Sequence, residues 1–208
     1  MDDCLPHAGR RGQLPRAERR AQLLEIATVK FGERGYHATS MAEIALASGV
    51  TKPVLYQHFA SKEDLYVAVI DEIGTGLEAG IADLVHEHAT TPERIRAGIG
   101  IFFDLLTTQS STLRLFFGAE FVSEKVQAEV RDVVDRAARS VGDVLVHTRQ
   151  LSDADALLIG HACTAAVQAA AKQAHEATPH ERDHILESLT TLLTHGLESF
   201  AASPPREP

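Results

Sequence analysis

The sequence predicts an all-α protein, and three observations support this fold class. Apolar residues recur at intervals of three and four along much of the chain, as on the buried stripe of an amphipathic helix. Helix-start signals are frequent: Ser40-Met-Ala-Glu43 has the pattern of a capping box, and Thr91-Pro92 and Thr178-Pro179 place proline in a first turn. β-Branched residues do not alternate with polar ones over a useful length, and no Asn-Gly or Asp-Gly hairpin signal occurs.

These signals predict about nine helices. We expect them at residues 17–34, 40–47, 51–58, 61–85, 91–107, 110–118, 123–148, 152–176 and 179–202. The second begins at the capping box, and the third begins at Thr51 with Lys52 and Pro53 in its first turn. The fourth and eighth begin at Ser61-Lys-Glu-Asp64 and Ser152-Asp-Ala-Asp155, which have the same pattern with Asp in place of Glu. The fifth and ninth begin at the Thr-Pro pairs.

Apolar stripes at helical spacing support the longer helices. They run from Leu65 to Leu84 in the fourth, Ile95 to Leu106 in the fifth, Val126 to Val144 in the seventh and Ile185 to Phe200 in the ninth. Residues 1–15 and 203–208 are rich in Pro, Gly, Arg and Ser, so we expect a flexible basic arm and a flexible tail there.

Composition excludes several classes of protein. The chain has 208 residues, 44% of them hydrophobic and 24% charged, which excludes a mainly disordered or collagen-like chain. No uninterrupted apolar run approaches the roughly 18 residues of a membrane-spanning helix, and no hydrophobic segment follows the acidic N-terminus. The two cysteines make no disulfide framework. We therefore expect a cytoplasmic protein without a membrane partner.

Charge is divided unevenly along the chain. Residues 1–62 contain 9 Lys and Arg against 6 Asp and Glu, a net charge of +3. Residues 63–208 contain 11 against 23, a net charge of −12. Contact with a polyanion is therefore expected at the N-terminal end alone.

Two short predicted helices between residues 40 and 58 form a helix-turn-helix. Ala47-Ser48-Gly49-Val50 separates them, and Gly49 permits the left-handed backbone of a sharp turn. Leu55 and Phe59 are four residues apart and can be buried together, next to Ile44 and Ala45 of the first helix. The outer face of the second helix is polar and rich in donors, as a helix that enters the major groove of DNA must be.

The same stretch carries a family resemblance. Phe31-Gly-Glu-Arg-Gly35-Tyr36, Ala47-Ser-Gly49-Val50-Thr51-Lys52-Pro53-Val-Leu55-Tyr56-Gln-His58-Phe59 and Ser61-Lys62-Glu-Asp-Leu65 resemble the DNA-binding domain of the tetracycline-repressor-like (TetR) family over about residues 17–70. The resemblance implies a homodimeric, all-helical transcription factor, usually a repressor. It further implies a C-terminal domain that binds a small molecule and releases a palindromic DNA operator. We expect a basic arm at 1–15, a DNA-binding domain at 16–62, a ligand-binding and dimerisation domain at 63–202 and a tail at 203–208.

The resemblance assigns candidate DNA contacts. Expected contacts to phosphates are Thr39, Ser40, Tyr56, His58 and Lys62, and residues expected to face bases are Thr51, Lys52, Pro53 and Gln57. The chemistry agrees, since Gln57 can pair with an adenine edge and Lys52 can reach guanine O6 and N7. Two alternatives stay open: Tyr56 belongs partly to the core, or His58 only caps the end of its own helix.

The last two helices are the expected dimer interface. Small residues on the eighth helix allow close approach, and two such helices from each chain would form a four-helix bundle. The expected interface residues are Ala162, Ala166, Ala169, Leu189, Leu193, Gly196 and Phe200. The alternative is a core within one chain.

The middle helices are the expected site of a small, apolar or amphipathic effector. Five of the eight phenylalanines lie within residues 102–121, and an apolar pocket with a few polar groups suits such a ligand. Expected ligand contacts are Phe102, Phe103, Arg114, Phe117, Phe121, His147, His161 and Gln168. The alternative is that the phenylalanines form plain core.

Other functions have weaker support. His86 with His88, and His180 with His184, have the spacing of metal pairs but lack the further ligands of a tetrahedral site, so we expect neither metal nor cofactor. The sequence contains no phosphate loop, nucleophile elbow or His-Glu-x-x-His motif, so we expect no enzyme. The alternative function is a helical lipid or small-molecule carrier, or an enzyme, with a vestigial helix-turn-helix.

Three glycines in the fourth helix need a reason, since each costs up to about 1 kcal/mol relative to alanine. Gly74, Gly76 and Gly80 either pack closely against a neighbouring helix, or Gly74 and Gly76 let this helix bend when a ligand binds.

Overall fold

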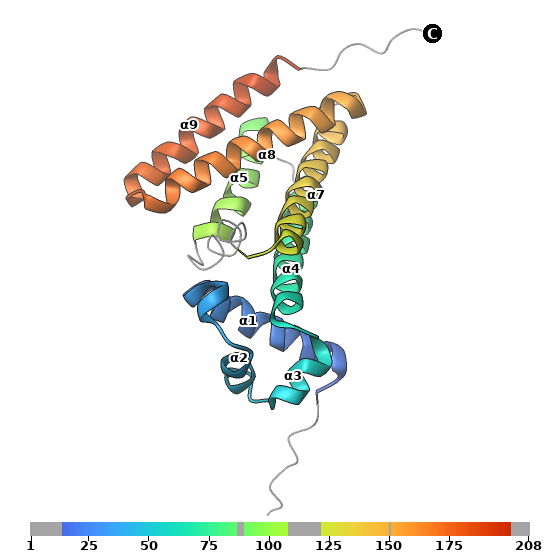
Figure 1. Cartoon of the computed structure of the whole chain (residues 1–208). Helices are drawn as coiled ribbons and strands as arrows, with labels where there is room; N and C mark the ends of the chain where they lie inside the picture. The colour runs from blue at the N-terminus through green and yellow to red at the C-terminus, as the bar shows by residue number, and fades with distance from the viewer. Residues whose placement is uncertain (1–13, 87–89, 108–121, 150, 201–208) are drawn as a thin grey trace, which may run out of the picture.

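The structure is a computed structural model that describes residues 14–86, 90–107, 122–149 and 151–200 (Figure 1). These residues form eight helices and no strand, which confirms the all-α prediction. The helices are α1 (Arg16–Ala38), α2 (Met41–Ala47), α3 (Lys52–His58), α4 (Lys62–Asp83), α5 (Thr91–Thr107), α7 (Glu124–Arg149), α8 (Asp153–Glu176) and α9 (Pro179–Glu198). The helix expected at 110–118 lies outside the described residues.

Helices α1 to α3 form the unit at the lower end of Figure 1. Its core contains Phe31, Ile44 and Leu55, each with 0% of its surface exposed, which is the burial that the apolar spacing predicts. The same buried cluster continues through α4 to Val126 and Val133 of α7. This three-helix unit is therefore packed directly on the body of the protein.

Helix α1 is interrupted at Gly35, whose φ of +77° lies in the region that favours glycine. The sequence predicts an end at residue 34, and the helical residues beyond Gly35 extend the element to Ala38. The hydroxyl of Thr39 donates to the carbonyl oxygens of Gly35 (2.8 Å) and Lys30 (3.1 Å), which fixes this bend.

Helices α4 and α7 run side by side and in the same direction (Figure 1). Lys125 pairs with Asp64 at the start of both helices. Arg136 donates to carboxylates of Asp71 (2.9 Å) and Glu78 (2.8 Å) further along. Ion pairs therefore hold α4, which leaves the three-helix unit, against α7 of the body.

Helix α8 crosses α7 at two glycines, Gly142 of α7 and Gly160 of α8. A Cβ atom on Gly160 would lie 2.3 Å from the carbonyl oxygen of Ala138, so only glycine permits this approach. By length and composition alone, Asp153–Ala174 is long and apolar enough to cross a membrane, with a mean hydropathy of 1.2. In the structure this segment packs on α7 and α9, as the core helix of a folded domain does.

Candidate functional site

The turn between α2 and α3 has the geometry of a helix-turn-helix. Gly49 adopts a φ of +65°, and the N–H of Val50 donates to the carbonyl oxygen of Ala45 at 3.0 Å. The capping box at the start of α2 is present, because the N–H of Glu43 donates to Oγ of Ser40 (3.2 Å) and the N–H of Ser40 donates to the Glu43 carboxylate (2.8 Å). Local chemistry therefore fixes both ends of α2.

Helix α3 separates an apolar side from a polar side. Leu55 is 0% exposed, and Phe59, which directly follows the helix, is 3% exposed. The outer side consists of exposed residues: Thr51, Lys52, Pro53, Tyr56 and Gln57. Tyr56 is 49% exposed, so about half of its surface faces solvent. The side chains that face solvent carry both donors and acceptors, as base edges and phosphates require.

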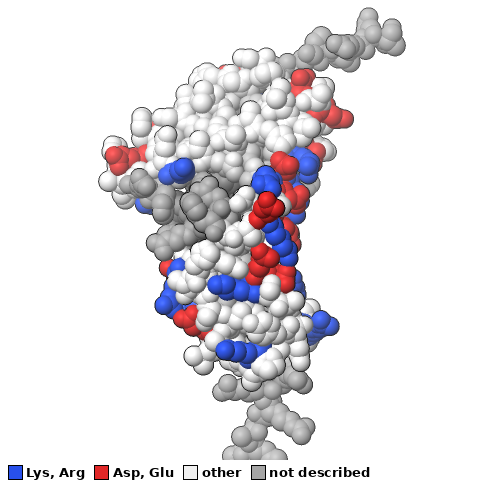
Figure 2. All heavy atoms as spheres, viewed as in Figure 1, with Lys and Arg blue, Asp and Glu red and all other residues white. Residues whose placement is uncertain are grey.

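A groove joins α3 to the start of α1. Arg16 and Arg19 of α1 line it together with Thr51, Gln57 and His58. Burial lowers the pKa of His58, and the positive charges of Arg16, Arg20 and Arg19 lower it further. Lysines and arginines are also visible on this lower unit in Figure 2. The N-terminal excess of positive charge therefore lies beside the polar face of α3.

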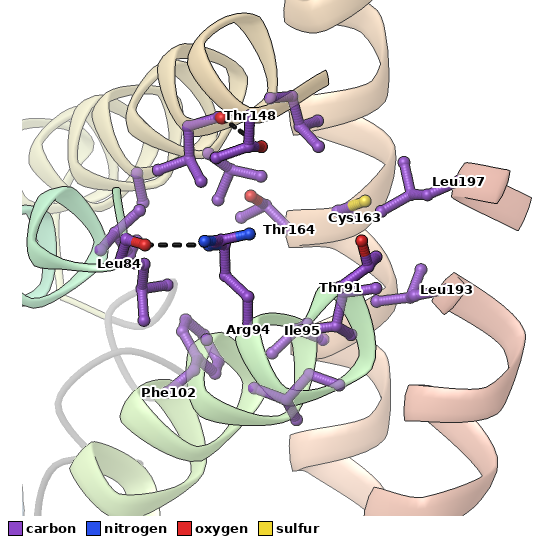
Figure 3. A pocket seen from close by; sticks show the side chains of 18 of the residues that line it. Leu84, Thr91, Arg94, Ile95, Phe102, Thr148, Cys163, Thr164, Leu193 and Leu197 are labelled. Atoms are coloured by element: carbon purple, nitrogen blue, oxygen red, sulfur yellow. Dashed lines mark hydrogen bonds between the residues drawn. The ribbon is translucent and has the colours of Figure 1, made fainter. Parts of the chain in front are cut away.

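A second site is a cavity of about 110 Å³ in the body, enclosed by α5, α7, α8 and α9 and the C-terminal half of α4 (Figure 3). Its walls are mostly aliphatic, with Phe102 on α5. The polar groups that reach it include the guanidinium of Arg94 and the hydroxyl of Thr164. An apolar cavity with few polar groups has the character of a small-molecule site.

Known proteins resemble this chain in both regions. Residues 23–69 match the model of the family described as bacterial regulatory proteins, tetR family. The chain is 42% identical over 138 residues to the HTH-type transcriptional activator FasR of Mycolicibacterium smegmatis, covering 65% of this chain and 63% of FasR. It is 40% identical over 82 residues to the HTH-type transcriptional repressor KstR2 of Mycobacterium tuberculosis, covering 38% and 39%. A TetR-like transcriptional regulator from Rhodococcus sp. RHA1 has a TM-score of 0.64 at 26% identity, covering 89% of this chain and 99% of that one.

Residues 23–69 therefore form a DNA-binding domain of the tetR family. This confirms the family that the helix-turn-helix residues predict. The matches to FasR and KstR2 span less than two thirds of the length of those proteins. The matched segment of the family model includes α2, the turn and α3, so the exposed side of α3 lies within the tetR-family domain.

Two residues expected at phosphates have structural partners in this tetR-family domain. Thr39 is 2% exposed, and its hydroxyl is used in the Gly35 bend. The Nζ atom of Lys62 donates to the carbonyl oxygens of Tyr36 (2.9 Å) and Thr39 (3.0 Å) and lies 4.2 Å from the centre of the Tyr36 ring. An ammonium has three donors, so Lys62 retains one beyond these two carbonyls. Ser40 is exposed, and its hydroxyl is bonded to Glu43 in the capping box.

The pocket in the body contains one of the expected ligand contacts. Phe102 lines it, whereas Phe103 is 7% exposed and packs in the core beside Ile99 and Val167. His147 and His161 are exposed, and neither they nor Gln168 line the cavity. Arg114, Phe117 and Phe121 lie outside the described residues.

Sequence reasoning missed the polar groups of the pocket. Arg94, Arg149 and Thr164 line it, and none was among the expected contacts. A signal was present for Arg94, which lies three residues after Thr91 and four before Gly98 on the stripe of α5 that faces the cavity. A charged residue inside an apolar stripe is the pattern that could have identified it.

The expected dimer residues divide into two groups. Ala162, Ala169, Gly196 and Phe200 are exposed, and Ala166 is half-buried. Leu189 is 7% exposed within the chain itself, and Leu193 lines the pocket. The large exposed apolar side chains of α8 and α9 are instead Leu157, Leu158 and Leu192.

Proposed function

We propose that the protein is a non-enzymatic, cytoplasmic transcriptional regulator that binds a palindromic DNA operator as a homodimer. A small apolar or amphipathic effector in the body would release it from the operator, which makes repression the expected sign of regulation. The observation that carries the proposal is the exposed polar side of α3 within the segment that matches the tetR-family model. In this proposal, residues 16–62 form the DNA-binding domain and residues 63–202 form the ligand-binding and dimerisation domain, with a basic arm at 1–15 and a tail at 203–208.

The DNA contacts would divide by chemistry. Gln57 presents an amide that can pair with an adenine edge, and Lys52 presents an ammonium for guanine. Thr51 and Pro53 would pack beside them in the groove. Ser40, Tyr56, His58 and Lys62 would contact phosphates and set the register of α3. The arginines at the start of α1 support this orientation, because they line the same groove as Gln57.

A dimer would use the outer surface of α8 and α9. Leu158 and Leu192 are 69% and 66% exposed, and small residues such as Ala162 and Ala169 lie on the same helices. Figure 2 shows that the face over these helices carries few charged side chains. An exposed apolar surface of this kind is typical of a contact with another protein chain. A palindromic operator also needs two recognition helices, one from each chain of a dimer.

Effector binding would act through α4. Leu77 and Ile81 of α4 line the cavity, and the same helix begins at Lys62, beside the helix-turn-helix. A ligand that prefers one position of α4 would shift the distance between the two copies of α3.

Retention of DNA fragments tests the proposal. The full chain is mixed with a pool of fragments at low and at moderate salt, and the retained fragments are sequenced. A regulator retains a defined sequence at both salt concentrations, whereas non-specific binding falls steeply as salt rises. Retention without sequence preference would reject the proposal and favour a carrier with a vestigial helix-turn-helix. A reporter gene placed behind the retained sequence then gives the sign of regulation, since KstR2 is named a repressor and FasR an activator.

A further inference from the structure

The polar groups of the pocket gather at one end and carry positive charge. Among the lining residues that the structure describes, the charged ones are Arg94 and Arg149, and none is a carboxylate. Arg94 lies in the first turn of α5 and Arg149 is the last residue of α7, whereas the lining residues farther from these helix ends, such as Phe102 and Val141, are apolar. The surrounding sequence has the opposite charge, a net −12 over residues 63–208. A cationic end inside an acidic body favours an anionic ligand.

Arg94 is held in position for such a ligand. Its Nε atom donates to the carbonyl oxygen of Leu84 at 2.9 Å, which fixes the plane of the guanidinium. Figure 3 shows the guanidinium inside the cavity, between Leu84 and Thr164. A planar guanidinium matches the two oxygens of a carboxylate, and their hydrogen bonds are strengthened by charge.

Thr164 gives a second, independent indication. It is 6% exposed, and its Oγ1 atom has no hydrogen-bond partner in the described part of the chain. Buried hydroxyls are nearly always hydrogen-bonded, so an orphan hydroxyl in the wall of a cavity indicates a ligand that supplies the partner. A carboxylate placed against Arg94 would accept from this hydroxyl.

We infer that the pocket binds an apolar carboxylic acid, with its carboxylate against Arg94 and Thr164 and its hydrocarbon part between α5 and α7. The inference rests on the proposed function only in taking this cavity as the effector site. The cavity of about 110 Å³ is smaller than the roughly 150 Å³ cavity that holds benzene in a well-studied protein core.

Calorimetric titration of the full chain with octanoate, 1-octanol and octylamine tests the inference. The three probes share one hydrocarbon chain and differ in the charge of the head group. Octanoate is expected to bind about tenfold tighter than 1-octanol, since hydrogen bonds to a charged partner are the stronger ones. Octylamine is expected to bind more weakly than either. Equal affinity for octanoate and 1-octanol overturns the inference.

Variants locate the carboxylate. Arg94→Gln should abolish the preference for octanoate, whereas Arg96→Gln, on an exposed residue of the same helix, should preserve it. Thr164→Val keeps the shape of the side chain and should weaken octanoate binding by about threefold. A folded Arg94→Gln protein that still prefers octanoate overturns the inference. If this variant does not fold, the Thr164→Val titration and the wild-type preference decide.

DNA retention, measured on the same protein, separates this inference from the proposed function. Wild-type protein that retains a defined DNA sequence but does not prefer octanoate overturns the inference alone. Protein that prefers octanoate without retaining a defined sequence overturns the proposed function and leaves the carboxylate site in place.

Discussion

A Cβ atom on Gly74 of α4 would lie 2.7 Å from Cγ2 of Val133 on α7, closer than such atoms approach in folded proteins. Val133 is 1% exposed and β-branched, so it cannot easily move aside. Two residues further along α4, nothing described lies within 4 Å of a Cβ on Gly76. Close packing therefore accounts for Gly74 but not for Gly76.

The matched substitutions Gly74→Ala and Gly76→Ala measure this contact. Both gain about 1 kcal/mol of helix propensity, but Gly74→Ala alone suffers overpacking, which costs about 1–3 kcal/mol. We expect urea denaturation to show Gly76→Ala more stable than wild type and Gly74→Ala less stable than Gly76→Ala by that amount. Equal stability of the two variants would contradict the packing account. It would leave a bending role as the remaining reason for Gly74.

Lys62→Ala should lower stability as well as DNA affinity. The substitution removes the ammonium that binds the carbonyl oxygens of Tyr36 and Thr39, and loss of such charged hydrogen bonds costs about 1–3 kcal/mol. Lys52→Ala is the control, because Lys52 is exposed on α3 and a surface substitution changes stability by about 0.5 kcal/mol or less. Thermal unfolding distinguishes them. Equal melting temperatures for the two variants would show that the hydrogen bonds from Lys62 to Tyr36 and Thr39 contribute nothing to stability.

Neighbouring leucines of α9 should respond differently to a charge. Leu192 is 66% exposed, so Leu192→Glu should leave the protomer folded and convert dimers to monomers in sedimentation experiments. Leu193 lines the pocket and packs against two buried clusters, so Leu193→Glu removes apolar contacts inside the protomer and should lower its stability. A Leu192→Glu protein that still sediments as a dimer would place the interface elsewhere.

His58 should make stability depend on pH. Burial and the charges of Arg16, Arg20 and Arg19 lower its pKa in the folded state, below the value of about 6.5 expected for an unfolded chain. As pH falls through this range, the unfolded state binds a proton that the folded state does not, so stability decreases. The contribution is complete above the unfolded pKa and is lost toward the folded pKa. Denaturation between pH 7 and pH 5 should therefore show a smaller loss for His58→Gln than for wild type, and an identical loss would refute this role.

Helix starts could be predicted because they depend on residues close in sequence. Ser40 with Glu43 forms the capping box, and Thr178 with Glu181 forms another, each over three residues. The same holds for the turn, where one glycine supplies the required backbone. The exposed polar side of α3 could be predicted from the same short-range features. Leu55 and Phe59 are buried on one side of the helix, so its other side faces solvent.

The pocket could not be predicted in the same way, because its walls come from five helices. Periodicity identifies an apolar stripe but not which residues of it face a cavity, so Phe102 and Phe103 have the same pattern and different surroundings. Helix α9 is apolar on two sides, and its period alone does not say that Leu192 faces outward and Leu193 inward. The partners of Lys62 lie 23 and 26 residues away in the chain, beyond any local signal.

Selection of bound duplexes from a random pool, with wild-type protein and with Gln57→Ala, tests most directly the claim that α3 reads DNA bases. The account predicts that wild type enriches an inverted repeat whose half-sites are centred about one helical turn, or a multiple of it, apart. Gln57→Ala should enrich the same repeat with a relaxed preference at one position of each half-site, because a base contact contributes about 1–3 kcal/mol of discrimination. An identical preference for both proteins, or no enriched sequence for wild type, would contradict it.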